Sequence, residues 1–202
     1  LAQAALFLQA TCQRCENKSG PASAFGMSRE SGPSDVPTTT LVIWDYDWSL
    51  INCNSDTFVI EGLRPELAKH FDDDSLGWTA LMDAQMQRLW DSGVTSDEIT
   101  SVVAGVPVFP GCLEVVKACA TLPEVKQVIV SDANSVFIEA FLDSQGLRHV
   151  FHGIITNPAE FDEHGRLRVR PHAAYQCPLC PENLCKGAVL EALVSELAPQ
   201  RV

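Results

Sequence analysis

The chain has 202 residues, of which 46% are hydrophobic, and its formal net charge at pH 7 is −12. This length allows one hydrophobic core of ordinary size together with a small inserted subdomain. Nucleic-acid binding is disfavoured, because neutralising a phosphate backbone requires clustered Lys and Arg side chains. No apolar run approaches the roughly 20 residues that a membrane span requires. We therefore expect neither a nucleic-acid nor a membrane partner, and the oligomeric state stays open.

Residues 1–39 are expected to form a disordered N-terminal segment, because the stretch 12–40 is rich in Ser, Gly, Pro and Thr and shows no apolar periodicity. The chain begins at Leu1, and the short apolar stretch 1–10 is either a remnant of a targeting segment or the arbitrary leader of a fragment. The eight cysteines do not follow a secreted disulfide framework. This favours a reducing, intracellular and cytoplasmic location, with organelle targeting left open.

Residues 40–202 alternate between strand and helix patterns. The β-branched run Thr40–Trp44 predicts a buried parallel strand, and helical periodicity follows over about 55–105. The segment Thr95-Ser96-Asp97-Glu98 is typical of a helix start. The later expected elements are a helix at 112–120, a strand at 125–130, a helix at 135–145, a strand at 152–156, a hairpin arm at 167–169 and a helix at 184–197. This alternation predicts an α/β fold with a parallel sheet covered on both faces.

Polar side chains follow two of the predicted strands. Asp45 and Asp47 come after the first strand, and Ser131 and Asp132 follow the second. Alone, each group is also consistent with a turn or a helix cap. Because ligands of open α/β sheets bind beyond the carboxyl ends of the strands, the groups together indicate a functional site.

These residue types suit phosphoryl transfer, which needs an in-line nucleophile, charge neutralisation and protonation of the leaving group. Of two carboxylates separated by one residue, one can attack phosphorus while the other moves the proton. Such a pair also attracts Mg2+, which prefers oxygen ligands. The hydroxyl of Ser131 and the ammonium of Lys186 could hold the remaining phosphoryl oxygens.

Three segments carry a family resemblance, beginning with Asp45-Tyr46-Asp47-Trp48-Ser49. With Ser131-Asp132-Ala133-Asn134 and the cysteine-lysine block that ends at Lys186, it resembles the first three motifs of the haloacid dehalogenase-like phosphatases. The similarity is narrower still to the phosphoethanolamine/phosphocholine and pyridoxal phosphate phosphatases, and covers residues 40–197. It implies a three-layer Rossmann-like parallel sheet with a helical cap inserted after the first strand.

The resemblance also implies a role for each motif residue. Asp45 would be the nucleophile and a Mg2+ ligand. Asp47 would be the general acid and base, with its backbone carbonyl on the metal. Ser131 would bind the transferring phosphoryl group, and Lys186 would neutralise the charges of the aspartate and the phosphate. The substrate would be a small phosphate monoester such as phosphoethanolamine, phosphocholine or pyridoxal phosphate.

In this branch of the family, Asp56, Asp132 and Asn134 would contact the substrate, where a carboxylate favours an amine or quaternary ammonium. The alternatives are a helix cap for Asp56 and a turn residue for Asp132. Trp48 stands where many relatives carry a small polar or charged residue, so it is expected to shape the pocket rather than to react.

The cysteine block is open to two interpretations. His172, Cys177, Cys180 and Cys185 could form a tetrahedral Cys3His zinc site, since Cys-x2-Cys is a common ligand spacing. Alternatively, the cysteines are buried packing residues or a redox-sensitive pair beside Lys186.

A fourth family motif, an acidic strand-end segment that completes the metal site, is not found before Val202. We therefore expect a fragment that lacks its last strand or strands and a third metal-binding carboxylate. Two functions follow as hypotheses. One is a Mg2+-dependent phosphatase, and the other is a catalytically silent relative or a zinc-stabilised interaction module.

Overall fold

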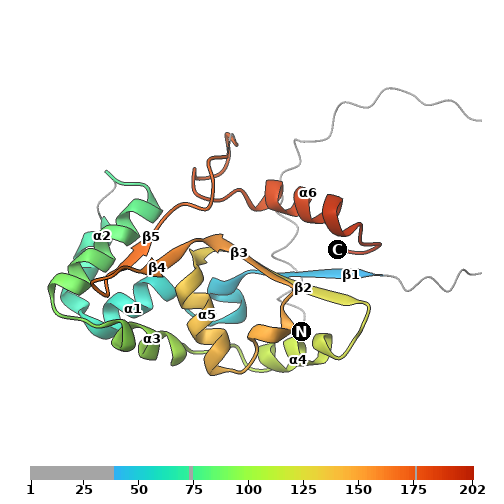
Figure 1. Cartoon of the computed structure of the whole chain (residues 1–202), viewed down its shortest axis with the longest axis horizontal. Coiled ribbons are helices and arrows are strands. Elements are labelled where there is room, and N and C mark those ends of the chain that lie inside the picture. The colour runs from blue at the N-terminus through green and yellow to red at the C-terminus, as the bar shows by residue number, and fades with distance from the viewer. Residues whose placement is uncertain (1–38, 73–74, 176) are drawn as a thin grey trace, which may run out of the picture.

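The computed structural model describes residues 39–72, 75–175 and 177–202, so the segment expected to be disordered lies, apart from its last residue, outside the described residues. The centre of the fold is a parallel sheet of β1 (Thr40–Trp44), β2 (Val125–Asn134) and β3 (Gly153–Asn157), in the order β1-β2-β3. Helices α4 (Cys112–Ala120) and α5 (Ser135–Ser144) lie against one face, and α6 (Lys186–Leu197) lies against the other (Figure 1). This arrangement confirms the predicted three-layer α/β fold.

The register of the sheet explains why the motif residues meet. Trp44 pairs with Ile129, so Asp45 leaves β1 level with the part of β2 that leads into Ser131. The pairing of β2 with β3 shifts between Val130 and Asn134. The strand therefore continues beyond its predicted end at residue 130, through an irregularity that the sequence pattern did not indicate. Such bulges turn side chains toward a site at the edge of a sheet.

Two hydrophobic clusters hold the layers together, because side chains alternate between the faces of a strand. Val128 and Val130 of β2 pack with Val189 and Leu193 toward α6. Ile129, which lies between them, belongs to the larger cluster with the helices of the opposite face. A sheet buried on both faces explains why its strands are almost continuously apolar.

The expected cap corresponds to helices that lie between β1 and α4 in the sequence. They are α1 (Ser55–Leu63), a 3-10 segment (Pro65–Asp72), α2 (Trp78–Asp91) and α3 (Ser96–Ala104). In Figure 1 they gather beyond the carboxyl ends of the strands. The helix start predicted at residues 95–98 is confirmed by a capping box, in which Thr95 and Glu98 hydrogen-bond each other's backbone N–H groups.

A hairpin of β4 (Ala159–Phe161) and β5 (Leu167–Val169) joins the sheet side to the cap. Gly165 takes a left-handed conformation, with φ of 82°, in its turn. Asp83 of α2 accepts hydrogen bonds from Arg166 at 2.6 Å and from the Val169 N–H at 3.0 Å. The hairpin therefore stabilises one side of the cap.

The remaining boundaries differ from prediction by one or two residues. A short 3-10 turn spans Arg148–Val150, β3 begins one residue later than expected, and α6 begins at Lys186 rather than at residue 184. After α6, Arg201 pairs in parallel with Thr40 along the free edge of β1. Among the described residues, no helix combines the length and apolar character needed to cross a bilayer.

Candidate active site

Asp45 is the first residue after β1, and both of its carboxylate oxygens are engaged. Oδ1 accepts a hydrogen bond from the Tyr46 N–H at 2.8 Å. Oδ2 accepts one from Nζ of Lys186 at 2.6 Å, which joins two segments that lie far apart in the sequence. The carboxylate is partly exposed, so it keeps free lone pairs on the solvent side.

Asp47 lies in the wide turn Tyr46–Leu50 that follows β1. Its Oδ1 accepts a hydrogen bond from the Ser55 N–H at 2.9 Å, and Oδ2 accepts one from Asn54 at 3.4 Å. Burial, assisted by the charges of Asp45 and other carboxylates, raises the pKa of Asp47 to about 6. A carboxyl group with this pKa can both donate and accept a proton near neutral pH.

Lys186 opens α6 and lies between two carboxylates. Its Nζ is 2.6 Å from Asp45 and 3.2 Å from Asp132. Burial disfavours the ammonium form, but the charges of the two carboxylates outweigh it and raise the pKa of Lys186 above its ordinary value. The side chain is therefore a permanent cation beside the predicted nucleophile.

The three predicted site residues at the bulge of β2 differ in their exposure and in their hydrogen-bond partners. Ser131 is fully buried, and its Oγ accepts a hydrogen bond from the Ala133 N–H at 3.3 Å. Asp132 is exposed and forms the ion pair with Lys186. Asn134 is buried and caps α5, because its Oδ1 accepts a hydrogen bond from the Phe137 N–H at 3.0 Å. The predicted contact of Asn134 with substrate stays a prediction beside this capping role.

A cavity of about 280 Å3 brings most of these groups together. Its described lining residues are Asp45, Asp47, Trp48, Asn54, Asp56, Trp78 and Asp132. Four of the seven are carboxylates, contributed by the end of β1, by α1 and by the bulge of β2. Trp48 is 64% exposed and takes a left-handed conformation with φ of 57°. Its place in the lining agrees with the expectation that it shapes the pocket.

Asp56 lies on the cap side of this cavity and is only 3% exposed. Nε1 of Trp78 donates a hydrogen bond to its Oδ2 at 2.8 Å, and the indole stacks on Phe71 at 5.7 Å. Burial and the charge of Asp47 raise the pKa of Asp56 to about 7. The helix-cap alternative for Asp56 is wrong, because Asn54 caps α1.

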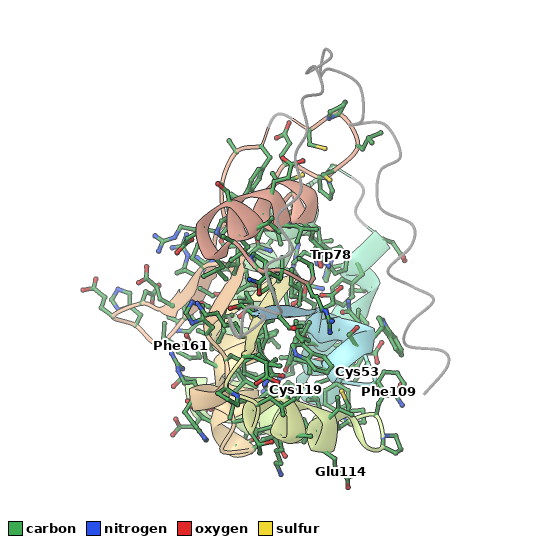
Figure 2. The ribbon with its side chains drawn as sticks, turned by 90° about the vertical axis from the view of Figure 1, so that its right-hand side faces the viewer. Cys53, Trp78, Phe109, Glu114, Cys119 and Phe161 are labelled. Carbon is green, nitrogen blue, oxygen red and sulfur yellow. The ribbon has the colours of Figure 1, made fainter. Side chains whose placement is uncertain are left out.

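Two residues of the cavity lining, Asn54 and Trp78, were not predicted from the sequence, and Trp78 is labelled in Figure 2. Its position at the start of a helix, directly after Gly77, was the available signal. That signal cannot show that the indole reaches a carboxylate 22 residues earlier in the chain.

The cysteine block forms a separate cluster next to Lys186. The sulfur atoms of Cys177, Cys180 and Cys185 all lie within 4.8 Å of one another, and the last two are 3.6 Å apart. His172 lies outside this group, with its Nδ1 2.9 Å from the hydroxyl of Tyr175 and its ring stacked on the phenol. The structure thus brings together three of the four residues predicted to bind zinc.

The thiols of this cluster differ in acidity. Hydrogen bonding from the backbone of Leu179 and from Cys180 holds the pKa of Cys177 below its ordinary value. Hydrogen bonds to the neighbouring thiols raise the pKa of Cys180 to about 12.

Comparison with known proteins gives the family. The model of the family described as Putative Phosphatase matches residues 40–202. Pyridoxal phosphate phosphatase PHOSPHO2 of Bos taurus is 34% identical over 172 residues, which cover 80% of this chain and 69% of that protein. Inorganic pyrophosphatase 2 of Arabidopsis thaliana is 32% identical, with 79% of this chain and 59% of that protein covered. A thiamine phosphate phosphatase-like protein of the same plant is 35% identical, with 76% and 64% covered. The chain thus spans roughly 59–69% of the length of these relatives.

Solved structures give the fold. A phospho-aspartyl intermediate analogue of phosphoserine phosphatase superposes with a TM-score of 0.55 at 15% identity, over 81% of this chain and 74% of that one. A HAD family hydrolase from Salmonella enterica subsp. enterica serovar Typhi gives the same TM-score and identity, over 83% of this chain and 55% of that one. The chain therefore belongs to the Putative Phosphatase family of phosphatases and has the haloacid dehalogenase-like fold.

Proposed function

We propose that the protein hydrolyses a small phosphate monoester through an aspartyl-phosphate on Asp45, with the help of Mg2+. The observation that carries this proposal is the 2.6 Å contact between Lys186 and Asp45 at a cavity that Asp47 also lines. The proposed nucleophile and a carboxyl group with a pKa of about 6 then line one cavity, and a cation contacts the nucleophile. A catalytically silent interaction module has no need of this combination.

The reaction proceeds in two steps. A carboxylate oxygen of Asp45 forms a bond to phosphorus as the bond from phosphorus to the ester oxygen breaks. The protonated carboxyl of Asp47 gives its proton to the departing oxygen, so an alcohol leaves. In the second step, Asp47 takes a proton from water as the water oxygen attacks phosphorus. Inorganic phosphate leaves and Asp45 is regenerated.

Lys186 lowers the energy of both steps by offsetting negative charge. Its ammonium already contacts Asp45 and can follow the charge onto the phosphoryl oxygens without a large movement. Removing one such preorganised donor costs about 10²–10³ in rate in well-studied enzymes. Ser131 is proposed to hold a phosphoryl oxygen; its hydroxyl is buried next to Asp132, which lines the cavity.

The donor set at the end of β1 fits Mg2+. Asp45 and Asp47 supply carboxylate and carbonyl oxygens, and Mg2+ is typically bound by one or two carboxylates plus phosphate and water. Each oxygen of Asp45 uses one lone pair in its present hydrogen bond, which leaves capacity for a metal. When bound, the ion would neutralise negative charge on the phosphoryl group.

The surplus of carboxylates favours a substrate with a positively charged organic part. Mg2+ and Lys186 together balance the charge of Asp45 and of a phosphate dianion. Asp56 and Asp132 remain, and the indole of Trp78 lies beside them. A carboxylate next to an aromatic face suits an amine or a quaternary ammonium. Phosphoethanolamine carries an amine, phosphocholine carries a quaternary ammonium, and pyridoxal phosphate carries a pyridine nitrogen that is positive when protonated, whereas pyrophosphate adds further negative charge.

The test is phosphate release from a panel of these four compounds by the full chain with Mg2+, compared between wild type and Asp45→Asn. We expect release by wild type, fastest for the cationic monoesters, and none above background for the variant. Equal release by both proteins would remove Asp45 from the mechanism. No release from any compound by the wild type would favour the interaction module.

A further inference from the structure

Three thiols converge in the segment that leads from β5 to α6. All three sulfur atoms of Cys177, Cys180 and Cys185 lie within 4.8 Å of one another, and all are free thiols. The other cysteines that the structure describes lie elsewhere. Figure 2 shows Cys119 near α4, on the far side of the molecule from α6.

The spacing of the sulfurs matches a metal coordination sphere. In a tetrahedral zinc site with bonds of about 2.3 Å to sulfur, neighbouring sulfurs lie ~3.8 Å apart. Cys180 and Cys185 are already 3.6 Å apart, and Cys177 lies within 4.8 Å of both. Shifts of an ångström or less would therefore close the three thiolates around one ion.

We propose that Cys177, Cys180 and Cys185 bind one zinc ion as three thiolates, with solvent in the fourth position. This proposal goes beyond the phosphatase activity and changes the ligand set expected from the sequence. His172 is not needed, because its ring is held by the hydroxyl and the ring of Tyr175. On binding, each of the three thiols releases its proton to solvent, and no oxidation occurs.

The position of the cluster gives the ion a structural purpose. Cys185 is the N-cap residue of α6, yet its side chain makes no capping hydrogen bond. Lys186 follows directly and reaches Asp45. Of the described leucines of this loop, Leu184 is buried but Leu179 is 71% exposed. A zinc ion on Cys185 would fix the start of α6 and thereby the lysine at the catalytic carboxylate.

A disulfide is the competing use of the same residues. Cys180 and Cys185 are close enough to pair after a modest approach, but a disulfide consumes two thiols and leaves Cys177 beside it without a role. Convergence of three sulfurs, with a Cys-x2-Cys spacing in the sequence, favours a metal.

The decisive experiment measures zinc in the full chain, purified with a phosphine reductant, by native mass spectrometry and elemental analysis. We expect about one zinc per chain, falling at least fivefold in Cys177→Ser and in Cys180→Ser. Cys119→Ser is the matched control and keeps the ion. Zinc below about 0.1 per chain, both as purified and after incubation with a zinc salt, would overturn the proposal. Equal loss from Cys119→Ser would overturn it as well.

A second measurement guards against variants that fail to fold. Replacing zinc by Co2+ in the wild-type chain gives visible and near-ultraviolet bands whose intensity reports thiolate ligation. Three thiolates produce strong sulfur-to-cobalt absorption, and its absence in a folded wild-type chain would contradict the site. Neither readout uses phosphatase activity. Asp45→Asn should keep its zinc while losing phosphate release, so the zinc site and the proposed catalytic function can fail separately.

Discussion

The cavity has two walls, a sheet wall that carries Asp45 and a cap wall that carries Asp56, and the surroundings of these two carboxylates differ. On the sheet side, Asp45 is partly exposed and pairs with Lys186 at 2.6 Å. On the cap side, Asp56 is almost fully buried, accepts a hydrogen bond from the indole N–H of Trp78, and has a pKa of about 7. The sheet wall thus pairs its carboxylate with a cation.

The difference indicates a division of labour. A carboxyl group that is half protonated near neutral pH gains most from a ligand that brings a positive charge, because the ligand restores its ionised form. We therefore assign the phosphoryl group to the sheet wall and the organic head group to the cap wall. Each prediction below changes one wall and leaves the other in place.

The largest effect is expected from Asp45→Asn, which removes the nucleophile from the sheet wall. The rate constant kcat should fall by on the order of 10⁴ or more for every substrate, since removing a covalent nucleophile has effects of this size. Phosphate release and trapping of the phosphoenzyme by acid quench measure the loss. Glu114→Gln, an exposed carboxylate on α4 that points away from the molecule in Figure 2, is the control and should be unaffected.

Lys186→Met should lower kcat by about 10²–10³, because it removes one preorganised cation from the transition state. The loss should be similar for cationic and neutral substrates, since the lysine acts on the phosphoryl group. Steady-state kinetics on both kinds of substrate measure it, with Lys117→Met of α4 as the control. A loss confined to cationic substrates would show that Lys186 acts on the organic head group and not on the phosphoryl group.

Asp47→Asn should separate substrates by their leaving groups. An alkyl alkoxide needs a proton to depart, whereas p-nitrophenolate leaves readily without one. The variant should therefore lose about 10²-fold more activity on phosphoethanolamine than on p-nitrophenyl phosphate, within the range of general acid catalysis. With the pKa of Asp47 at about 6, wild-type kcat should also change across this pH. Equal losses on the two substrates would remove Asp47 from the role of general acid.

The smallest effect concerns stability and the cap wall. Folding raises the pKa of Asp56 from 3.8 to about 7, so the folded protein holds a proton that the unfolded chain releases. This contribution to stability is complete below pH 3.8 and is lost as the pH rises to about 7. Asp56→Asn cannot titrate, so its melting temperature should fall less than that of wild type over this interval. If the melting temperatures of the two proteins fall in parallel as the pH rises, Asp56 ionises normally.

Most residues of the sheet wall could be predicted from the sequence. Asp45 and Asp47 follow a strand whose apolar run is unmistakable, and the parallel order of the strands places Ser131 at the same edge. Chain position alone was enough, because the carboxyl ends of parallel strands must meet. The same logic could not foresee the bulge of β2, which depends on backbone pairing with β3.

The cap wall and the cysteine cluster depend on tertiary contacts. Trp78 meets Asp56 only because two cap helices pack together, and no periodicity reports that contact. The spacing of His172 from the cysteines in the sequence made it a candidate zinc ligand, but its ring stacks on Tyr175 instead. Residue type and spacing identified the candidate groups, and only packing decided which of them meet.

The division of labour is tested most directly by a matched pair of substrates. Phosphocholine and 3,3-dimethylbutyl phosphate have the same shape, but only the first carries a positive charge. We expect wild type to prefer phosphocholine by about tenfold in kcat/KM, a difference of ~1.4 kcal/mol. Asp56→Asn should bring this ratio close to one while still hydrolysing the neutral ester. A preference that survives unchanged in Asp56→Asn would contradict the assignment of the head group to the cap wall.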